Sequence, residues 1–171
     1  VSPSGKLPIT FPRSLADLPP YEDYSMEGRT YRYMRAEPLF PFGFGLSYTQ
    51  FDFREIVVLP GRARARVRVA NTGPRAGEEV VQVYTRAVEP GCPAPRCQLA
   101  GFRRVALASG EEKEIEVALS SLAFRLVDES GRIFKHAGAW EVYAGGCSPL
   151  PRSQELGAPP PAKTTIKPAL E

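Results

Sequence analysis

The sequence predicts a mainly β chain, in which one β-sandwich follows an irregular N-terminal arm. Residues 48–147 carry short apolar alternations that turn signals interrupt roughly every 8–14 residues, as in proteins built from short strands. The 171 residues include 18 Pro and 15 Gly, which argues against long helices because Pro removes a donor and Gly costs entropy. Apolar residues make up 43% and charged residues 24%, which excludes a fully disordered chain.

Strands are expected in the middle segment at residues 51–58, 62–69, 80–88, 98–107, 113–119, 124–127, 132–135 and 140–144. The second is the clearest, because Arg alternates with Ala or Val in a strict period of two. Its inward side chains would be Ala63, Ala65, Val67 and Val69. A hairpin turn is expected at residues 128–131. About seven short strands in about 100 residues are typical of an immunoglobulin-like or fibronectin type III-like β-sandwich.

The segments on either side of the sandwich have no such period. Residues 1–47 are rich in Pro, Gly and aromatic side chains, and a stretch this irregular cannot make a core of its own. We therefore expect this arm to lie on another surface. Residues 148–171 return to Pro, Ala, Ser and Lys, and we expect a disordered tail there.

No group of residues predicts an active site, and no catalytic residue is assigned. Acidic neighbours in a strand point to opposite faces, whereas a glycosidase needs two carboxyl groups about 5–9.5 Å apart across one bond. We expect solvated faces or turns at Glu22–Asp23, Glu78–Glu79, Glu111–Glu112 and Asp128–Glu129. His136, the one histidine, has no GxSxG motif to serve and is interpreted as a loop or sheet-edge side chain.

The cysteines predict neither a metal site nor a redox motif. Cys92 and Cys97 lie close together in a Pro-rich stretch and could close a small disulfide loop, which leaves Cys147 over. Three Cys and one His without a second close pair do not indicate a structural zinc site, and no cofactor is expected.

Charge and hydropathy exclude two classes of partner. A net charge of +3 gives little reason to expect nucleic acid, and no run approaches the about 18 apolar residues of a membrane span. The chain opens on Val1 with no signal-like segment, so we expect a processed product or a fragment.

Two clusters of basic or aromatic residues have two interpretations each. Arg62, Arg64, Arg66 and Arg68 form a stripe that could bind an anion, but pairing with cross-strand Glu112, Glu114 and Glu116 is favoured. The arm interleaves Tyr21, Tyr24, Tyr31 and Tyr33 with Arg29, Arg32 and Arg35, ahead of the glycines and phenylalanines of residues 42–47. Such a segment can bind sugars or bases, but we expect it to pack onto a domain.

The arm also carries long, specific strings. Residues 18–33 (LPPYEDYSMEGRTYRY) and 37–48 (EPLFPFGFGLSY) closely resemble the C-terminal region of glycoside hydrolase family 3 enzymes. Residues 3–12 (PSGKLPITFP) and 73–84 (GPRAGEEVVQVY) are similar to further segments of this family, as are 99–105 and 138–145. The resemblance covers roughly residues 1–147, and its GRTYRY string looks most like the β-xylosidase and α-arabinofuranosidase branch.

The resemblance implies a retaining glycosidase in which an Asp nucleophile and a Glu acid/base lie upstream of Pro3. Residues 1–47 would be the end of the family's α/β-sandwich domain with a connecting arm, and residues 48–147 its fibronectin type III-like domain. The expected partners are the upstream catalytic domains of the same chain and, through them, an oligosaccharide substrate. These 171 residues alone are predicted to be inactive, and Arg29, Tyr31 and Arg32 are candidates to lie near substrate.

Two other hypotheses remain open at this stage. The chain could be a stand-alone, non-enzymatic module that binds glycan or protein through the aromatic arm. It could also be a degenerate gene product with a structural role. An extracellular or secretory location is expected by analogy with enzymes of this kind.

Overall fold

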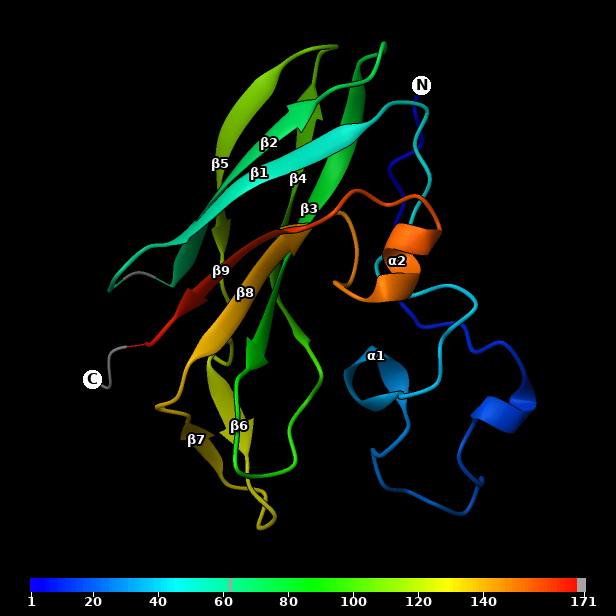
Figure 1. Cartoon of the computed structure of the whole chain (residues 1–171), viewed down its shortest axis with the longest axis vertical. Helices are drawn as coiled ribbons and strands as arrows, with labels where there is room; N and C mark the ends of the chain where they lie inside the picture. The colour runs from blue at the N-terminus through cyan, green and yellow to red at the C-terminus, as the bar shows by residue number, and fades with distance from the viewer. Residues whose placement is uncertain (62, 169–171) are drawn as a thin grey trace.

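Two antiparallel sheets and a short hairpin make up most of the computed structural model, which describes residues 1–61 and 63–168 (Figure 1). The strands are β1 (Phe51–Val58), β2 (Arg64–Asn71), β3 (Gly77–Ala87), β4 (Gln98–Leu107), β5 (Glu112–Ala118), β6 (Arg125–Val127), β7 (Ile133–Lys135), β8 (Trp140–Gly145) and β9 (Ala162–Ile166). The helices are α1 (Thr30–Tyr33) and α2 (Pro151–Glu155), with a 3₁₀ turn at Leu15–Asp17. The predicted mainly β sandwich is confirmed.

The strand order is β1-β2-β5 in one sheet and β4-β3-β8-β9 in the other, with β6-β7 as the hairpin. Every expected strand is present, although β2 begins and ends two residues later than predicted. Ala65, Val67 and Val69 are fully buried, as expected from the alternation. Ala63 lies before the strand and is exposed, and Arg62 lies outside the described residues.

β1 changes its inward side part-way along its length. Phe51 and Phe53 are buried, and so is Ile56, which a strict period of two would point outward. The register against β2 shifts between Phe53 and Glu55, so this β-bulge adds one residue and returns Ile56 to the core. The core between the sheets therefore extends along the whole strand.

The outer face of β1-β2-β5 is a ladder of ion pairs. Arg66 lies opposite Glu116 and Arg68 opposite Glu114 in the register of β2 and β5. The guanidinium groups of β2 contact the glutamates of β5 in four pairs: Arg64–Glu116 at 3.3 Å, Arg66–Glu114 at 3.2 Å, Arg66–Glu116 at 4.0 Å and Arg68–Glu112 at 3.7 Å. The favoured cross-strand interpretation of the Arg stripe is confirmed for its described members.

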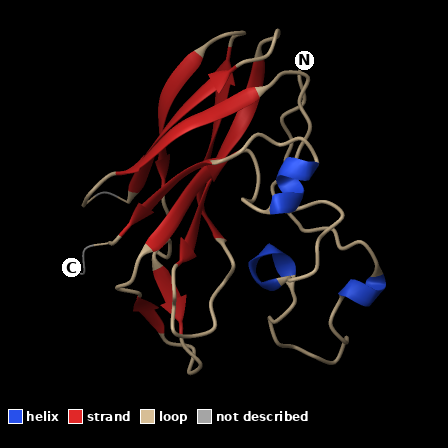
Figure 2. Ribbon diagram, in the orientation of Figure 1, coloured by secondary structure: helices blue, strands red, loops and turns tan. Residues whose placement is uncertain are grey.

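The outer face of the other sheet is covered by the arm. Figure 2 shows the short helices together on one side of the sandwich, joined by long loops. Gln82 and Tyr84, which point outward from β3, are 3% and 0% exposed because arm residues lie over them. The expectation that the arm lies on another surface therefore holds for the parts of the arm that cover β3.

The predicted disordered tail at residues 148–171 is wrong for the part that the structure describes. α2 packs beside the arm, and β9 pairs antiparallel with β8 from Trp140↔Ile166 to Ala144↔Ala162 (Figure 1). The pairing partners are distant in sequence, so local composition did not indicate the strand. Residues 169–171 of the expected tail lie outside the described residues.

Candidate functional site

The arm attaches to the sandwich through an aromatic cluster around Tyr31. The Tyr31 ring stacks on Phe42 at 4.2 Å between centroids and meets Tyr84 edge-on at 6.2 Å. Its hydroxyl oxygen accepts the N–H of Leu99 at 3.0 Å, so the side chain is satisfied as well as buried. Tyr31 therefore anchors α1 to β3 and β4, which fits the packing interpretation of the arm aromatics.

Gly43 lets the arm backbone come down onto β3. Its φ is +79°, and a Cβ there would lie 2.2 Å from Gln82 Oε1 and 2.8 Å from the Tyr84 hydroxyl. The close approach allows Gln82 Nε2 to donate to the carbonyls of Gly43 at 3.1 Å and Gly146 at 2.7 Å. Tyr84 donates its hydroxyl proton to Gln82 Oε1 at 2.6 Å, so the buried amide is fully bonded.

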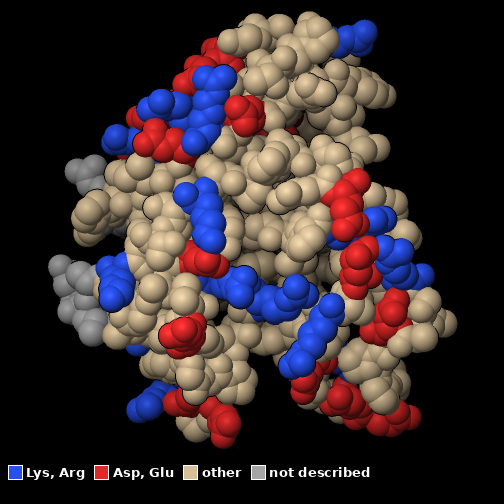
Figure 3. Space-filling model, viewed as in Figure 1, with Lys and Arg blue, Asp and Glu red and all other residues tan. Residues whose placement is uncertain are grey.

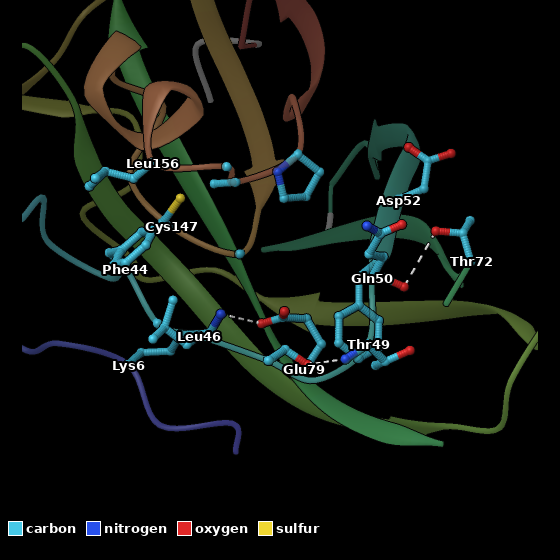
Figure 4. A pocket seen from close by; sticks show the side chains of 17 residues that line it. Lys6, Phe44, Leu46, Thr49, Gln50, Asp52, Thr72, Glu79, Cys147 and Leu156 are labelled. Carbon is cyan, nitrogen blue, oxygen red and sulfur yellow. Dashed lines mark hydrogen bonds and ion pairs between the residues drawn. The ribbon is translucent and has the colours of Figure 1, made fainter. Parts of the chain in front are cut away.

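A cavity of about 540 Å³ lies between the arm, the start of β1 and residues 156–159 (Figure 4). Lys6 of the arm reaches in and places its Nζ 2.7 Å from Glu79 Oε1 of β3, with both side chains largely buried. The same carboxylate accepts the N–H of Val80 at 2.7 Å. Both interactions are made within the chain, so the pair ties the arm to the sandwich.

Burial raises the pKa of Glu79 above its ordinary value, and the positive charge of Lys6 opposes that rise. The predicted solvated face holds for Glu78, which is exposed, but is wrong for Glu79, which is buried. Sequence reasoning missed this pair because Lys6 and Glu79 belong to segments with no local relationship. The available signal was an acidic residue just before the apolar run of β3.

The rim of the cavity is polar and open. Gln50, Asp52 and Thr72 lie at its mouth, and the Thr72 hydroxyl contacts the Gln50 carbonyl at 3.4 Å (Figure 4). Asp52 turns toward Arg54 at 3.4 Å, while Glu79 stays bound to Lys6. These groups can hold hydroxyl-bearing ligands, but neither carboxylate is free to act as half of a glycosidase pair.

Of the substrate-proximal candidates, Arg29 and Arg32 have different surroundings from Tyr31. Arg29 donates from Nε to the Ser25 carbonyl at 2.9 Å and from Nη2 to the carbonyls of Pro20 and Asp23, so it holds the preceding loop together. Arg32 is exposed, with its guanidinium carbon 5.9 Å from the Tyr31 ring centroid. The structure therefore brings Tyr31 and Arg32 together and uses Arg29 in the fold of the loop.

Cys92 and Cys97, which could close a small loop, are not joined in this structure, in which all three cysteines are free. Cys97 packs with Tyr31 and Tyr84, whereas Cys92 packs beside Trp140 in a different cluster, which separates the two thiols. His136 contacts the Val88 carbonyl at 3.3 Å and meets Trp140 edge-on at 5.8 Å, in keeping with a structural loop residue. Within the described residues no cluster of three or more His, Cys, Asp or Glu side chains is placed to hold a metal ion.

The N-terminal half of the arm leaves large apolar side chains in solvent. Tyr21 and Tyr24 are each 89% exposed and Leu15 is 86% exposed, with Leu18 and Met26 about half exposed nearby in the chain. Side chains of this size are usually covered, so a group of them on one loop marks a contact surface. No helix among the described residues is long and apolar enough to cross a membrane.

Family profiles match two separate parts of the chain. The profile described as "Glycosyl hydrolase family 3 C-terminal domain" matches residues 1–48, and that described as "Fibronectin type III-like domain" matches residues 79–148. The chain belongs to glycoside hydrolase family 3. The arm and the sandwich therefore carry the C-terminal signatures of this family.

The relatives of the chain are glycosidases. It is 34% identical over 162 residues to a periplasmic β-glucosidase of Salmonella typhimurium, covering 84% of this chain and 21% of that protein. It is 37% identical over 152 residues to a xylan 1,4-β-xylosidase of Xylanibacter ruminicola, covering 86% and 17%. The crystal structure of DesR, a β-glucosidase from Streptomyces venezuelae, matches 99% of this chain and 23% of its own, with 28% identity and a TM-score of 0.81. The chain spans about a fifth of these proteins.

Proposed function

We propose that these residues complete a retaining β-glycosidase of the β-xylosidase-like type, in which catalytic domains earlier in the protein carry out hydrolysis. The sandwich is the accessory domain, and the arm joins it to the catalytic part. The observation that carries this proposal is the exposed apolar loop at residues 15–26, which lies apart from the chain's own sandwich core.

The arm has the form expected of a connector between two surfaces. Its C-terminal half is fixed to the sandwich by Tyr31, Phe42 and Gly43, while Tyr21 and Tyr24 remain uncovered. Arg29 ties the loop that carries these tyrosines to α1 through its contacts with backbone carbonyls. A rigid loop of this kind can dock on a catalytic domain and bring Arg32, with Tyr31 behind it, near the substrate.

Relatives with both glucosidase and xylosidase names support hydrolysis of β-linked sugars. The GRTYRY string of the arm favours β-xylosides as substrates of this protein. The Salmonella relative is named a periplasmic enzyme, which supports a location outside the cytoplasm for this protein too.

The first test compares two lengths of the protein. The 171-residue chain is expected to hydrolyse no aryl β-xyloside or β-glucoside, while the protein with its preceding domains hydrolyses the β-xyloside faster. Turnover by the 171 residues alone, with contaminants excluded, would refute the proposal. Equal turnover of both sugars by the longer protein would refute only the β-xyloside assignment.

The second test concerns the exposed loop. The double substitution Tyr21→Ser and Tyr24→Ser should lower the thermal midpoint of the longer protein and leave that of the 171-residue chain unchanged. Phe102→Ser, at an exposed aromatic on β4, is the matched control and should change neither. If the tyrosine variant behaves alike at both lengths, the loop is not a contact with the catalytic domains.

The alternative is a free-standing module that binds glycan through the same loop. Its support is the exposure of Tyr21 and Tyr24 a few residues before Arg29 and Arg32, since aromatic faces stack on sugars. Saturable binding of xylo-oligosaccharides to the 171-residue chain, lost in the tyrosine double variant, would favour this alternative.

A further inference from the structure

A second cavity, of about 250 Å³, opens on the arm-covered side of the sandwich, away from the Lys6–Glu79 pair. It is lined by Arg86 near the end of β3, Arg96 and Cys97 before β4, Tyr143 of β8, and residues 149–151 at the start of α2. Two arginines and an apolar stretch of Pro and Leu therefore line one space of roughly the size of one sugar ring.

Cationic groups outnumber carboxylates around this cavity. Glu141 is the acidic side chain next to it, and its oxygens accept Lys163 Nζ at 2.6 Å and the Tyr143 hydroxyl at 2.6 Å. Arg86 reaches Glu141 only at 3.8 Å. Because Glu141 also accepts Lys163 and Tyr143, and Arg86 makes only this one long contact with it, most of the hydrogen-bonding capacity of Arg86 is left over.

Arg96 is held in place without a carboxylate partner. Its Nη1 donates to the Met34 carbonyl at 2.6 Å, and its backbone N–H donates to the Arg32 carbonyl at 2.7 Å. Within residues 1–61 and 63–168, no carboxylate oxygen lies within 4.0 Å of the Arg96 or Arg32 guanidinium. The arm thus brings a further arginine toward the cavity and fixes the one that lines it.

The positive charge of the nearby arginines acts on the buried thiol of Cys97. Burial raises the pKa of Cys97 to about 12, and the positive charges of Arg96, Arg86 and Arg32 each act to lower it. Arg86 and Arg96 line the cavity together with Cys97, and Arg32 lies over the ring of Tyr31, which packs against Cys97. Figure 3 shows Lys and Arg side chains forming a band across the middle of this face.

Ordinary solvated arginines are the competing interpretation, and the ladder on β2 shows how this chain builds those. Arg64, Arg66 and Arg68 each have a glutamate within 3.7 Å. At the cavity, Arg96 and the nearby Arg32 have no carboxylate within 4.0 Å among the described residues, and Arg86 shares Glu141, at 3.8 Å, with Lys163 and Tyr143. A guanidinium in that setting is suited to bind a planar oxyanion through two parallel hydrogen bonds.

We propose that this cavity binds the carboxylate of a uronic acid, with Arg86 and Arg96 holding the anion and Tyr143 and residues 149–151 lining the ring. The ligand class follows from the chemistry of the site: a bidentate anion contact, and an adjoining wall fit for the apolar face of a sugar. This assignment goes beyond the proposed hydrolysis, because the site is complete within the described chain and needs no catalytic domain.

The test is a titration of the protein with glucuronate, followed by calorimetry or NMR, with glucose as the neutral probe of the same shape. Glucuronate should bind saturably and at least tenfold more tightly than glucose, because the guanidinium groups can form charge-assisted hydrogen bonds only with the carboxylate. Equal affinities, or no binding of glucuronate, would overturn the proposal. Inorganic phosphate binding as tightly as glucuronate would overturn the assignment to a sugar acid.

Variants distinguish binding at this cavity from attraction of the anion by the overall positive charge of the protein. Arg86→Gln should weaken glucuronate at least tenfold, and Arg86→Lys should fall between, because an ammonium keeps the charge but loses the bidentate contact. Arg66→Gln on the opposite sheet removes one positive charge and should leave binding unchanged. The Arg86 side chain is more than half exposed, so its variants should keep the thermal midpoint; binding equal to that of the Arg66→Gln control would overturn the proposal.

Discussion

The strands of both sheets alternate inward and outward residues, but the outer face of one sheet is exposed to solvent and that of the other is covered. On β2 the outward residues are arginines, and their glutamate partners leave the face solvated. On β3 the outward residues near the middle of the strand are Gln82 and Tyr84, and the arm buries both. The difference teaches that an outward row of uncharged residues marks a face with a partner, whereas an outward row of matched charges marks a face without one.

The two faces should also differ in how much each contact stabilises the protein. Exposed ion pairs are worth about 0–1 kcal/mol each, because water screens them and their side chains lose freedom. Burying an aromatic side chain is worth about 1.5–3 kcal/mol, and an unsatisfied buried polar atom costs about 1–3 kcal/mol. We therefore expect the arm contacts to dominate, and three measurements test that ranking.

The largest effect is expected for Gly43→Ala. The new Cβ would meet Gln82 Oε1 and the Tyr84 hydroxyl, and the residue would keep a left-handed backbone. The free energy of unfolding should fall by about 3 kcal/mol or more, the sum of overpacking and the cost of positive φ. Urea unfolding of both proteins measures this difference.

Gly110→Ala is the matched control for the backbone contribution. Gly110 has φ +74° in the turn before β5, and a Cβ added there would have no neighbour within 4 Å. Its substitution should cost about 1–2 kcal/mol. If Gly43→Ala costs no more than Gly110→Ala, the arm does not press on β3 as described.

The next effect concerns the pH dependence of the Lys6–Glu79 contact. A carboxyl whose pKa is higher in the folded protein binds more protons when folded, between its ordinary value of 4.5 and its raised value. Through that window the contribution of Glu79 to the free energy of unfolding therefore falls as pH rises. Glu79→Gln should remove this fall, which appears as a difference in slope between the two proteins in urea unfolding at a series of pH values.

Glu78→Gln supplies the comparison for a neighbouring exposed carboxylate. Glu78 pairs with Arg104 at 3.0 Å on the surface of β3 and β4. In the Glu78→Gln protein the free energy of unfolding should still show the fall with rising pH that Glu79 causes. A Glu79→Gln protein whose pH profile runs parallel to that of the parent would show that this carboxyl does not titrate differently on folding.

The smallest effect is expected on the ladder. Arg66→Gln removes contacts to Glu114 at 3.2 Å and Glu116 at 4.0 Å, and should lower the free energy of unfolding by about 0.5 kcal/mol. In about 1 M salt the difference should vanish, because the screening length falls to about 3 Å. A loss that exceeds that of Gly43→Ala would reverse the ranking of the two faces.

Local patterns predicted the sandwich well because the alternation of apolar and polar residues in a half-buried strand shows which side chains point inward. The alternation of residues 64–69 predicted both the buried Val67 and the Arg–Glu pairing with β5. The glycines of residues 42–47 likewise predicted a turning backbone with phenylalanines packed on a neighbouring surface, which Gly43 and Phe42 bear out.

The features that sequence reasoning missed all depend on contacts between distant segments. Glu79 of β3 is covered by the arm, and Lys6, near the N-terminus of the arm, pairs with its carboxylate. β9 is ordered because β8 offers it an unpaired edge, although Pro and Ala dominate the sequence just before it. Arg86 and Arg96 of the second cavity belong to β3 and to the loop before β4, and Tyr143 comes from β8, so this lining became visible only in the fold.

The pairing of β9 with β8 also covers an edge of the sheet that could otherwise pair with another copy of the chain. Without β9, the backbone of β8 would present free N–H and C=O groups beside buried Trp140 and Val142, a template for edge-to-edge association with another copy. β9 is only five residues long, follows Pro161 and carries Lys163, all features that discourage further strand addition. A shortened version that stops at Ser148, the limit of the fibronectin type III-like match, would lose this protection and be prone to aggregate.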